Sequence, residues 1–323
     1  MLPAGGLITV FGGSGFIGRH TVRLLAQRGY RVRAAVRRPD LAGHLQPMGG
    51  PGQIVAVQAN LRDADSMRRS VAGADGVVNL VAVLAESGRQ TFDALHVEGA
   101  RQVAQTSVEA GAQVLVHLSS IGAGDRSPAC YSRSKAKGEA AVLGAFPGAV
   151  ILRPSIVFGP EDQFFNRFAG IAQSAPVMPS IAGRSRFQPV YVGDVAKAIV
   201  ASLAGAAKPG TVYELGGPEI LSFRDLLQIA MTYSGHERPL LPVPVWAAKL
   251  AAALTKPLPL AMRPITVDQV RMLAADNVVS AAAITDGRTL ADLGIAQPQT
   301  IEAVVPSYLE RFNTRGQYAH YRG

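Results

Sequence analysis

Near its start the chain reads Leu7-Ile8-Thr9-Val10-Phe11-Gly12-Gly13-Ser14-Gly15-Phe16-Ile17-Gly18. The apolar first half of this stretch predicts a strand that is buried on both faces. The glycines that follow let a chain turn tightly and approach a ligand closely. Apolar residues then recur at helical spacing over residues 19–28, and Gly29 ends the pattern. The stretch therefore predicts a strand, a glycine loop and a helix in succession.

The glycine loop also predicts a ligand. Gly12, Gly15 and Gly18 have the spacing GxxGxxG, and Gly13 with the last two satisfies GxGxxG. Between a buried strand and a helix, this pattern is typical of dinucleotide binding, because the N–H groups at the helix start favour an anionic pyrophosphate. The loop residues expected to bind the cofactor are Gly12, Ser14, Gly15, Phe16, Ile17 and Gly18.

Composition limits the class of protein. The 323 residues are 48% hydrophobic and 17% charged, which indicates a globular chain with one large domain or two modest ones. The net charge of +9 suits cofactor phosphates, an anionic membrane surface, nucleic acid or an acidic protein. Nucleic acid is the least favoured partner, since the basic residues are dispersed and the sequence carries no nucleic-acid-binding signature.

Cysteine use and hydropathy indicate the compartment. The single cysteine, Cys130, cannot form an internal disulfide, which favours a reducing environment. The first strand follows Met1 so closely that we expect no signal or transit peptide. The most apolar late stretch, residues 240–262, is interrupted by prolines and lysines and falls short of a membrane span. We therefore expect a chain that does not cross a membrane.

Strands and helices alternate along the first half of the chain. Expected strands cover residues 30–36, 53–58, 76–84 and 114–118, and expected helices cover 64–71, 91–110 and a segment starting at 127. This alternation predicts an α/β fold, a Rossmann-type doubly wound parallel sheet, with a smaller C-terminal α/β lobe. The expected division is 1–160 for the dinucleotide-binding domain and 161–323 for the lobe, with segments such as 188–204 returning to the first domain.

Two arginines follow the second expected strand. In dinucleotide folds an acidic side chain at the end of this strand binds the adenosine ribose, whereas arginine there suits a 2′-phosphate. Arg37 and Arg38 therefore favour NADP(H) over NAD(H). Solvated loop arginines are the alternative interpretation.

A serine pair and a tyrosine-lysine pair follow the next strands. Ser119-Ser120 ends the strand at 114–118, and Tyr131 and Lys135 lie four residues apart, on one face of the next helix. A lysine beside a phenol lowers the pKa of the tyrosine, which acid–base chemistry on a carbonyl requires. Tyr131 and Lys135 are thus the candidate catalytic residues.

The chain resembles a known superfamily at these motifs. The glycine loop, Ser119-Ser120 and Tyr131…Lys135, in this order, resemble the extended short-chain dehydrogenases/reductases. RPSIVFGPEDQFFN at 153–166, PVYVGDVA at 189–196, DQV at 268–270 and DNVVS at 276–280 are similar to an atypical branch. That branch contains the NAD(P)H-binding accessory subunit of respiratory complex I.

The resemblance implies tightly held NADPH in a subunit with a structural or assembly role. Its expected partners are other complex I subunits, at the junction of the peripheral and membrane arms, and an anionic lipid surface. The expected location is peripheral, on the cytoplasmic side of the inner membrane. Beyond the loop and the arginines, the expected cofactor-binding residues are Leu61, Val81, Ser119, Tyr131, Lys135 and Pro154.

The sequence departs from active reductases at two positions. Ile121 stands where active members carry a polar residue, and His96 stands where many carry asparagine. Isoleucine cannot donate a hydrogen bond to a reacting oxygen, so binding without turnover is the first hypothesis. The alternatives are an independent NADPH-dependent reductase or epimerase with Tyr131 as acid, and a redox-sensing regulator.

The six histidines show no metal-ligand spacing, and we expect them to be satisfied surface or core residues.

Three features of the lobe carry further expectations. Ser222 with Asp225 predicts a capped helix start. The apolar helix expected after Pro244, with Trp246, is either a core helix or an exposed face for a partner or lipid. The loop with Glu161 and Asp162 would bind substrate in an enzyme, or would only pack against its neighbours. The basic tail at 308–323 could be disordered alone and ordered in a complex.

Overall fold

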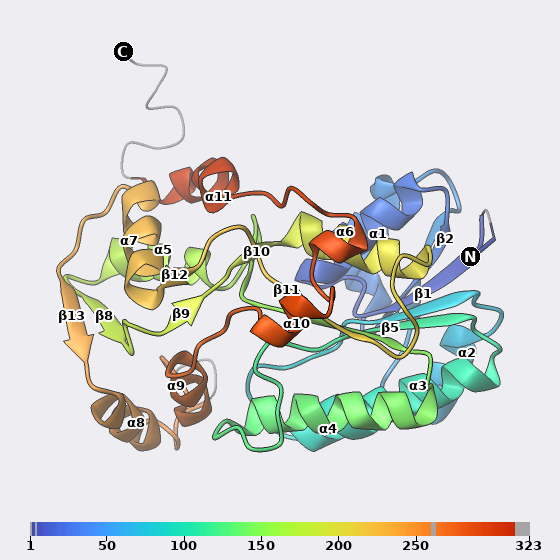
Figure 1. Cartoon of the computed structure of the whole chain (residues 1–323), viewed down its shortest axis with the longest axis horizontal. Helices are drawn as coiled ribbons and strands as arrows, with labels where there is room; N and C mark the ends of the chain where they lie inside the picture. The colour runs from blue at the N-terminus through green and yellow to red at the C-terminus, as the bar shows by residue number, and fades with distance from the viewer. Residues whose placement is uncertain (1, 4, 260–262, 314–323) are drawn as a thin grey trace, which may run out of the picture. The chain divides into compact units, whose positions relative to one another are not determined.

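The structure, a computed structural model, describes residues 2–3, 5–259 and 263–313. These residues form two compact units, which the chain enters repeatedly. Of the described residues, the first unit comprises those within 2–154, 192–215 and 279–296, and the second comprises those within 155–191, 216–278 and 297–313. Figure 1 traces the elements of both units along the chain.

A seven-stranded parallel sheet forms the centre of the first unit. Its spatial order is β3-β2-β1-β4-β5-β6-β11, which confirms the predicted doubly wound sheet. The strands are β1 (Leu7–Phe11), β2 (Arg31–Val36), β3 (Ile54–Gln58), β4 (Gly76–Asn79), β5 (Val114–Leu118), β6 (Val150–Pro154) and β11 (Val212–Leu215).

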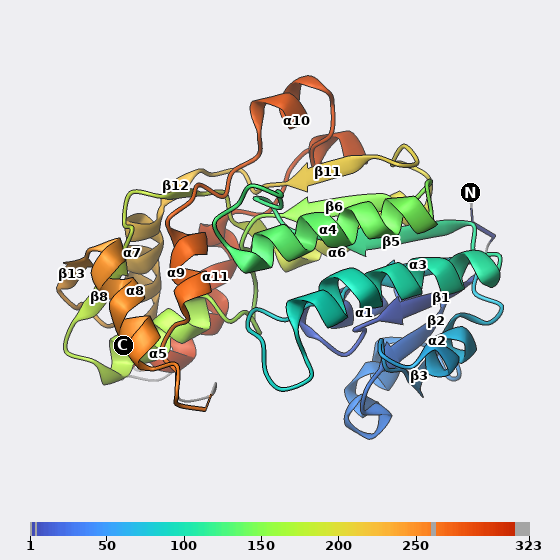
Figure 2. The same cartoon turned by 90° about the horizontal axis from the view of Figure 1, so that it is seen from below.

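Helices cover both faces of this sheet. On one face α1 (Phe16–Gln27) packs against α6 (Val192–Leu203). On the other face lie α2 (Ala64–Val71), α3 (Gly99–Glu109) and α4 (Cys130–Ala145), and Figure 2 shows α3 and α4 side by side. The core beneath them is apolar and fully buried, and includes Phe11, Met67, Val77, Val103, Leu115 and Ile151.

Two elements differ from the sequence expectation for local reasons. The strand expected over 76–84 ends at Asn79, because the Asn79 side chain accepts a hydrogen bond from the Val81 backbone N–H and turns the chain. The helix expected over 91–110 opens with a π-helical segment, Asp93–Glu98, before the regular α3. Such segments occur often at functional sites. In contrast α2 covers the predicted residues 64–71, since Asp63 caps its start.

The second unit packs helices against short strand pairs. The pairs are β7 (Val157–Phe158) with β10 (Val190–Tyr191), β8 (Met178–Ile181) with β13 (Leu240–Val243), and β9 (Arg186–Phe187) with β12 (Leu221–Ser222). The helices are α5 (Phe165–Ser174), α7 (Phe223–Ser234), α8 (Val245–Leu254), α9 (Val267–Leu273) and α11 (Ile301–Leu309), while α10 (Ala281–Thr285) belongs to the first unit. The predicted cap of α7 is confirmed, with Ser222 and Asp225 forming a capping box.

Asp162 and Tyr308 organise the core of the second unit. The Tyr308 hydroxyl donates to Asp162 at 2.6 Å, and the Asp162 carboxylate also accepts from the backbone N–H groups of Gly159, Phe164 and Asn166. Asp162 thus packs against its neighbours. The first residues of the basic tail are ordered, since Tyr308 is buried in α11, and residues 314–323 lie outside the described residues. Within the described ranges, no helix combines the length and apolarity that a membrane crossing needs.

Candidate functional site

The candidate site lies where the strand order of the sheet reverses. From β1 the chain builds β2 and β3 on one side, and then β4 on the other. Phe11 is the register partner of Asn79, and Asn79 is the partner of His117, so these strands end at one edge of the sheet. Ligands of open α/β sheets bind at this carboxyl edge, beside the reversal.

Close packing explains the glycines of the loop. Gly12 has φ +79°, a conformation that favours glycine. A Cβ atom on Gly18 would lie 2.2 Å from the Gly12 carbonyl oxygen, and one on Gly13 would lie 3.0 Å from the Ala34 Cβ. The Gly15 N–H donates to the Gly12 carbonyl at 3.0 Å and closes the turn. The loop therefore holds the start of α1 tightly against the end of β1.

The start of α1 has the features of an anion site. Gly15 is its N-cap residue and provides no side-chain hydrogen bond to the first turn, where Phe16 and Ile17 lie. Opposite the loop, the Val81 side chain would be 3.4 Å from a Cβ on Gly12, so Val81 borders the space above the glycines. Backbone N–H groups without a side-chain cap, together with the helix dipole, favour a phosphate there. The loop thus fits a dinucleotide.

Asn79 and His117 form a polar pair at the same edge. The Asn79 amide donates to His117 Nδ1 at 3.2 Å, which leaves the proton of the neutral ring on Nε2. His117 Nε2 is buried and has no hydrogen-bond partner among the described residues. The expectation of a fully satisfied core histidine is therefore wrong here. Sequence reasoning did not single out Asn79; its signal was a polar residue at the end of an apolar run.

Lys135 reaches the edge from α4. Its Nζ donates to the Leu118 carbonyl oxygen at 2.7 Å, next to Ser119, and the side chain is buried. Burial lowers the pKa of Lys135 to about 8, although Glu139 acts in the opposite direction. The neighbouring Ser119 hydroxyl is buried without a partner in the described part of the chain. An amine and a free hydroxyl thus lie at the strand end where a polar ligand group would bind.

Tyr131 is enclosed by aromatic rings. Phe92 and His96 pack edge-on against it, with ring centroids 5.9 Å and 5.4 Å away. Burial raises the pKa of Tyr131, and the nearby Ser120 hydroxyl opposes this shift in part. The protein alone therefore does not favour the phenolate that the sequence analysis expected from a neighbouring lysine. The Lys135 amine instead contacts the Leu118 carbonyl.

Both ring nitrogens of His96 are engaged. The Val83 backbone N–H donates to Nε2 at 3.0 Å, so Nδ1 carries the proton and donates to Ser134 Oγ at 2.8 Å. Burial, with a further contribution from Lys135, lowers the pKa of His96 to about 3. His96 is therefore a neutral structural residue. A Cβ on Gly138 would lie 2.1 Å from the His96 carbonyl oxygen, so α4 packs directly on this segment.

The remaining predicted residues surround this edge. Arg37 and Arg38 are exposed beyond the end of β2, where Arg37 donates to Gln90 at 3.0 Å and Arg38 pairs with Asp40 at 2.7 Å. Leu61 is buried and packs where a Cβ on Gly99 would meet it at 2.9 Å. Pro154 ends β6, and its carbonyl accepts from the Ile121 N–H at 2.9 Å. The described residues contain no cluster of three or more His, Cys, Asp or Glu suited to a metal ion.

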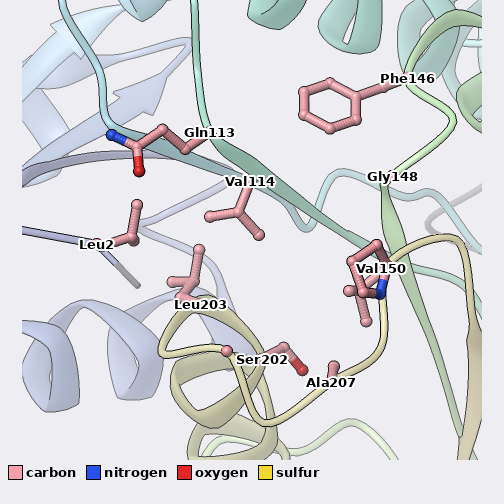
Figure 3. Close-up of a pocket in the computed structure, with 11 residues that line it drawn as sticks. Leu2, Gln113, Val114, Phe146, Gly148, Val150, Ser202, Leu203 and Ala207 are labelled. Atoms are coloured by element: carbon pink, nitrogen blue, oxygen red, sulfur yellow. The ribbon is translucent and has the colours of Figure 1, made fainter.

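A separate hollow lies at the opposite edge of the sheet. It has a volume of about 220 Å³, and Figure 3 shows the side chains of Leu2, Val114 and Leu203 converging on it. Val114 and Val150 begin β5 and β6, so this hollow is at the amino ends of the strands. It is not part of the candidate dinucleotide site.

Comparison with known proteins identifies the family. The sequence model of the "NAD dependent epimerase/dehydratase family" matches residues 8–216. The chain belongs to this family. Membership confirms the resemblance drawn from the glycine loop and the Tyr131…Lys135 pair, and it supports the binding of a nicotinamide dinucleotide.

Relatives of this epimerase/dehydratase family member are similar to it over most of the chain. "NADH dehydrogenase (ubiquinone) 1 alpha subcomplex subunit 9, mitochondrial" of Arabidopsis thaliana is 35% identical over 86% of this chain and 72% of its own. The protein of the same name from Mus musculus is 34% identical over 96% and 81%, respectively. The UDP-glucose 4-epimerase of Thermus thermophilus, solved with NAD, has a TM-score of 0.66 at 20% identity, covering 95% of this chain and 98% of its own. This last likeness shows a shared fold.

Proposed function

We propose that this chain is an NADPH-binding accessory subunit of respiratory complex I that does not turn over its cofactor. Two observations carry the proposal. The Gly12–Gly18 loop, which we call the dinucleotide cradle, has the geometry of a dinucleotide site. The chain also matches the mouse "NADH dehydrogenase (ubiquinone) 1 alpha subcomplex subunit 9, mitochondrial" over nearly its whole length. Its role is structural or assembly-related, near the junction of the peripheral and membrane arms. Its location is peripheral, on the cytoplasmic side of the inner membrane.

Each part of the edge has a role toward the cofactor. The Gly12–Gly18 loop and the start of α1 hold the pyrophosphate. Val81 and Leu61 border the nucleotide, and Ser119, Tyr131, Lys135 and Pro154 hold its nicotinamide end, where Lys135 and the free Ser119 hydroxyl bind polar groups. When bound, NADPH would supply a hydride. The chain's own residues supply binding and orientation.

The chemistry of the edge favours retention over turnover. A general acid needs a pKa near the working pH, whereas burial raises the pKa of Tyr131. His96 offers no proton relay, because its Nε2 accepts from the Val83 backbone N–H, which does not give up its proton. The Ile121 side chain offers no hydrogen bond to a developing oxyanion. The tyrosine and lysine would therefore serve the bound nucleotide itself.

Isolation of the native complex tests this function. We expect the chain to copurify with other complex I subunits and to carry about one NADPH, identified by mass spectrometry of the released nucleotide. The nucleotide is expected to stay reduced during quinone reduction by NADH. A free chain without other respiratory subunits would contradict the proposal. Oxidation of the bound NADPH by a carbonyl compound, abolished by Tyr131→Phe, would instead establish an independent reductase.

Arg37 and Arg38 support the choice of NADPH. Both are exposed beyond β2, within the first unit, where a 2′-phosphate is recognised in this fold. Arg38 is paired with Asp40 in the free protein, and this exposed pair costs little to separate. Two guanidinium groups could therefore turn toward a phosphate.

The double variant Arg37→Ser/Arg38→Ser is expected to lower the affinity for NADPH by about 10- to 100-fold, since a hydrogen bond to a charged group contributes about 1.5–3 kcal/mol. The affinity for NADH should change little. Isothermal titration with both nucleotides measures the difference. Arg28→Ser is the matched control, because Arg28 is exposed at the far end of α1. Equal losses for the two nucleotides would exclude 2′-phosphate recognition by this pair.

A further inference from the structure

The helix α8 presents two different faces. Ala248 and Ala252 are buried and pack with Val270 of α9, within the second unit. Trp246, Leu250 and Leu254 follow each other at intervals of four residues and are 71%, 56% and 73% exposed. The helix thus has both a buried core face and an exposed apolar face, the two alternatives that its sequence allows. We call Trp246, Leu250 and Leu254 the α8 apolar face.

Two exposed lysines lie beside the α8 apolar face. Residues 239–267 contain Lys249, Lys256 and Arg263 and no aspartate or glutamate. Lys249 is exposed and lies one turn from Trp246, and Lys256 is exposed just beyond the end of α8. The next acidic residue along the chain, Asp268, is 3.7 Å from Arg271. Nothing acidic in this segment offsets the lysines.

From this arrangement we infer that the α8 apolar face docks on an anionic lipid bilayer. A helix with large apolar side chains on its outer face and lysines beside them lies in the plane of a membrane interface, with the apolar side chains below the headgroups. Tryptophan favours this region, because its ring is apolar and its N–H is polar. The lysines would contact the anionic headgroups.

The lysines distinguish a bilayer from a protein partner. The cores of protein–protein interfaces are depleted in lysine, since its amine would have to leave water. Lys249 adjoins the α8 apolar face, one turn from Trp246, so a dry protein interface over that face would also cover its amine. At a bilayer its amine stays at the headgroup level while its stem covers apolar surface. The inference refines the peripheral location in the proposed function, which it presupposes, and assigns it to a named surface.

The single tryptophan of the chain reports directly on this surface. With purified full-length protein and vesicles containing about one third phosphatidylglycerol in phosphatidylcholine, we expect co-sedimentation and a blue shift of Trp246 emission. Brominated lipids should quench that emission. Vesicles of phosphatidylcholine alone should bind far less, and added salt should release the protein from the anionic vesicles.

Variants separate the contribution of the lysine charges from the contribution of the apolar side chains. Lys249→Gln/Lys256→Gln is expected to weaken binding to the anionic vesicles by about 30-fold, because each lysine near such a surface is worth about fivefold. Leu250→Ser/Leu254→Ser keeps the Trp246 probe and should lower binding by at least about tenfold. The matched control is Leu41→Ser, since Leu41 is 66% exposed in the first unit. It should bind as the wild type does.

Unchanged Trp246 emission and no sedimentation with anionic vesicles would overturn the inference. So would a native complex in which α8 peptides are protected from hydrogen exchange while anionic vesicles leave the isolated chain unbound, because a protein subunit would then cover the face. Both results concern α8 alone. They are distinguishable from failure of the proposed function, which would show as loss of the nucleotide or of the companion subunits.

Discussion

Replacement of Gly18 by alanine is expected to abolish tight binding of the nucleotide. The new Cβ would lie 2.2 Å from the Gly12 carbonyl oxygen and 2.7 Å from the carbonyl group of Gly13, so the loop or the start of α1 must move. A displaced loop loses at least one hydrogen bond to a charged phosphate, which corresponds to a loss of affinity of about 100-fold. Overpacking of this kind also lowers the free energy of unfolding by about 1–3 kcal/mol.

Titration of the nucleotide-free protein with NADPH, followed by fluorescence, measures the first effect, and urea denaturation measures the second. Gly144→Ala is the matched control, because a Cβ on Gly144 in α4 meets no atom within 4 Å. It should leave the affinity unchanged and raise the free energy of unfolding by about 0.5–1 kcal/mol, since alanine favours a helix over glycine. A Gly18→Ala variant that binds NADPH as tightly as the wild type would place the nucleotide elsewhere.

Acid is expected to destabilise the protein through its buried histidines. The pKa of His96 is lowered from 6.5 to about 3 in the folded protein, so below pH 6.5 the unfolded chain binds a proton that the folded chain does not. Stability is therefore lost as the pH falls below 6.5, and the loss ends near pH 3. Between pH 7 and pH 5 it amounts to about 2 kcal/mol from His96 alone. Burial lowers the pKa of His117 as well, and this adds in the same direction.

Urea denaturation at a series of pH values from 7 to 5 measures this dependence. His96→Gln should make it shallower, because a glutamine amide can accept from Val83 and donate to Ser134 without titrating. His44→Gln is the matched substitution at an exposed histidine. Equal slopes for the wild type and the His96→Gln variant would show that His96 is protonated in the folded protein.

Local signals in the sequence predicted the glycine loop and the strand and helix that it joins. Gly12, Gly15 and Gly18 act within a few residues of one another, and the adjoining strand and helix are specified by nearby apolar residues. The same holds for α2, where Asp63 fixes the start. Where a neighbour in sequence determines the structure, sequence reasoning reached the correct element.

Features that depend on distant segments were out of reach of sequence reasoning. The neutral state of His96 requires Ser134 and the turn at Val83, which the fold brings together from different segments. Asn79 bonds only the Nδ1 atom of His117, and the Nε2 atom of that ring has no partner among the described residues. Asn79 itself shortens β4, because its side chain competes with the sheet for the backbone. Each outcome depends on a tertiary partner that no spacing rule identifies.

The late segment 279–296 has a consequence for biosynthesis. Strand β11 is the edge of the large sheet, and Arg288 satisfies its outer backbone: the Glu214 N–H donates to the Arg288 carbonyl at 2.9 Å, and the Arg288 guanidinium donates to the Val212 carbonyl at 2.8 Å. An unsatisfied sheet edge is a template for aggregation. In a nascent chain on the ribosome, the outer backbone groups of β11 therefore stay unsatisfied until residue 288 has emerged. A chaperone that shields β11 from aggregation would act in that interval.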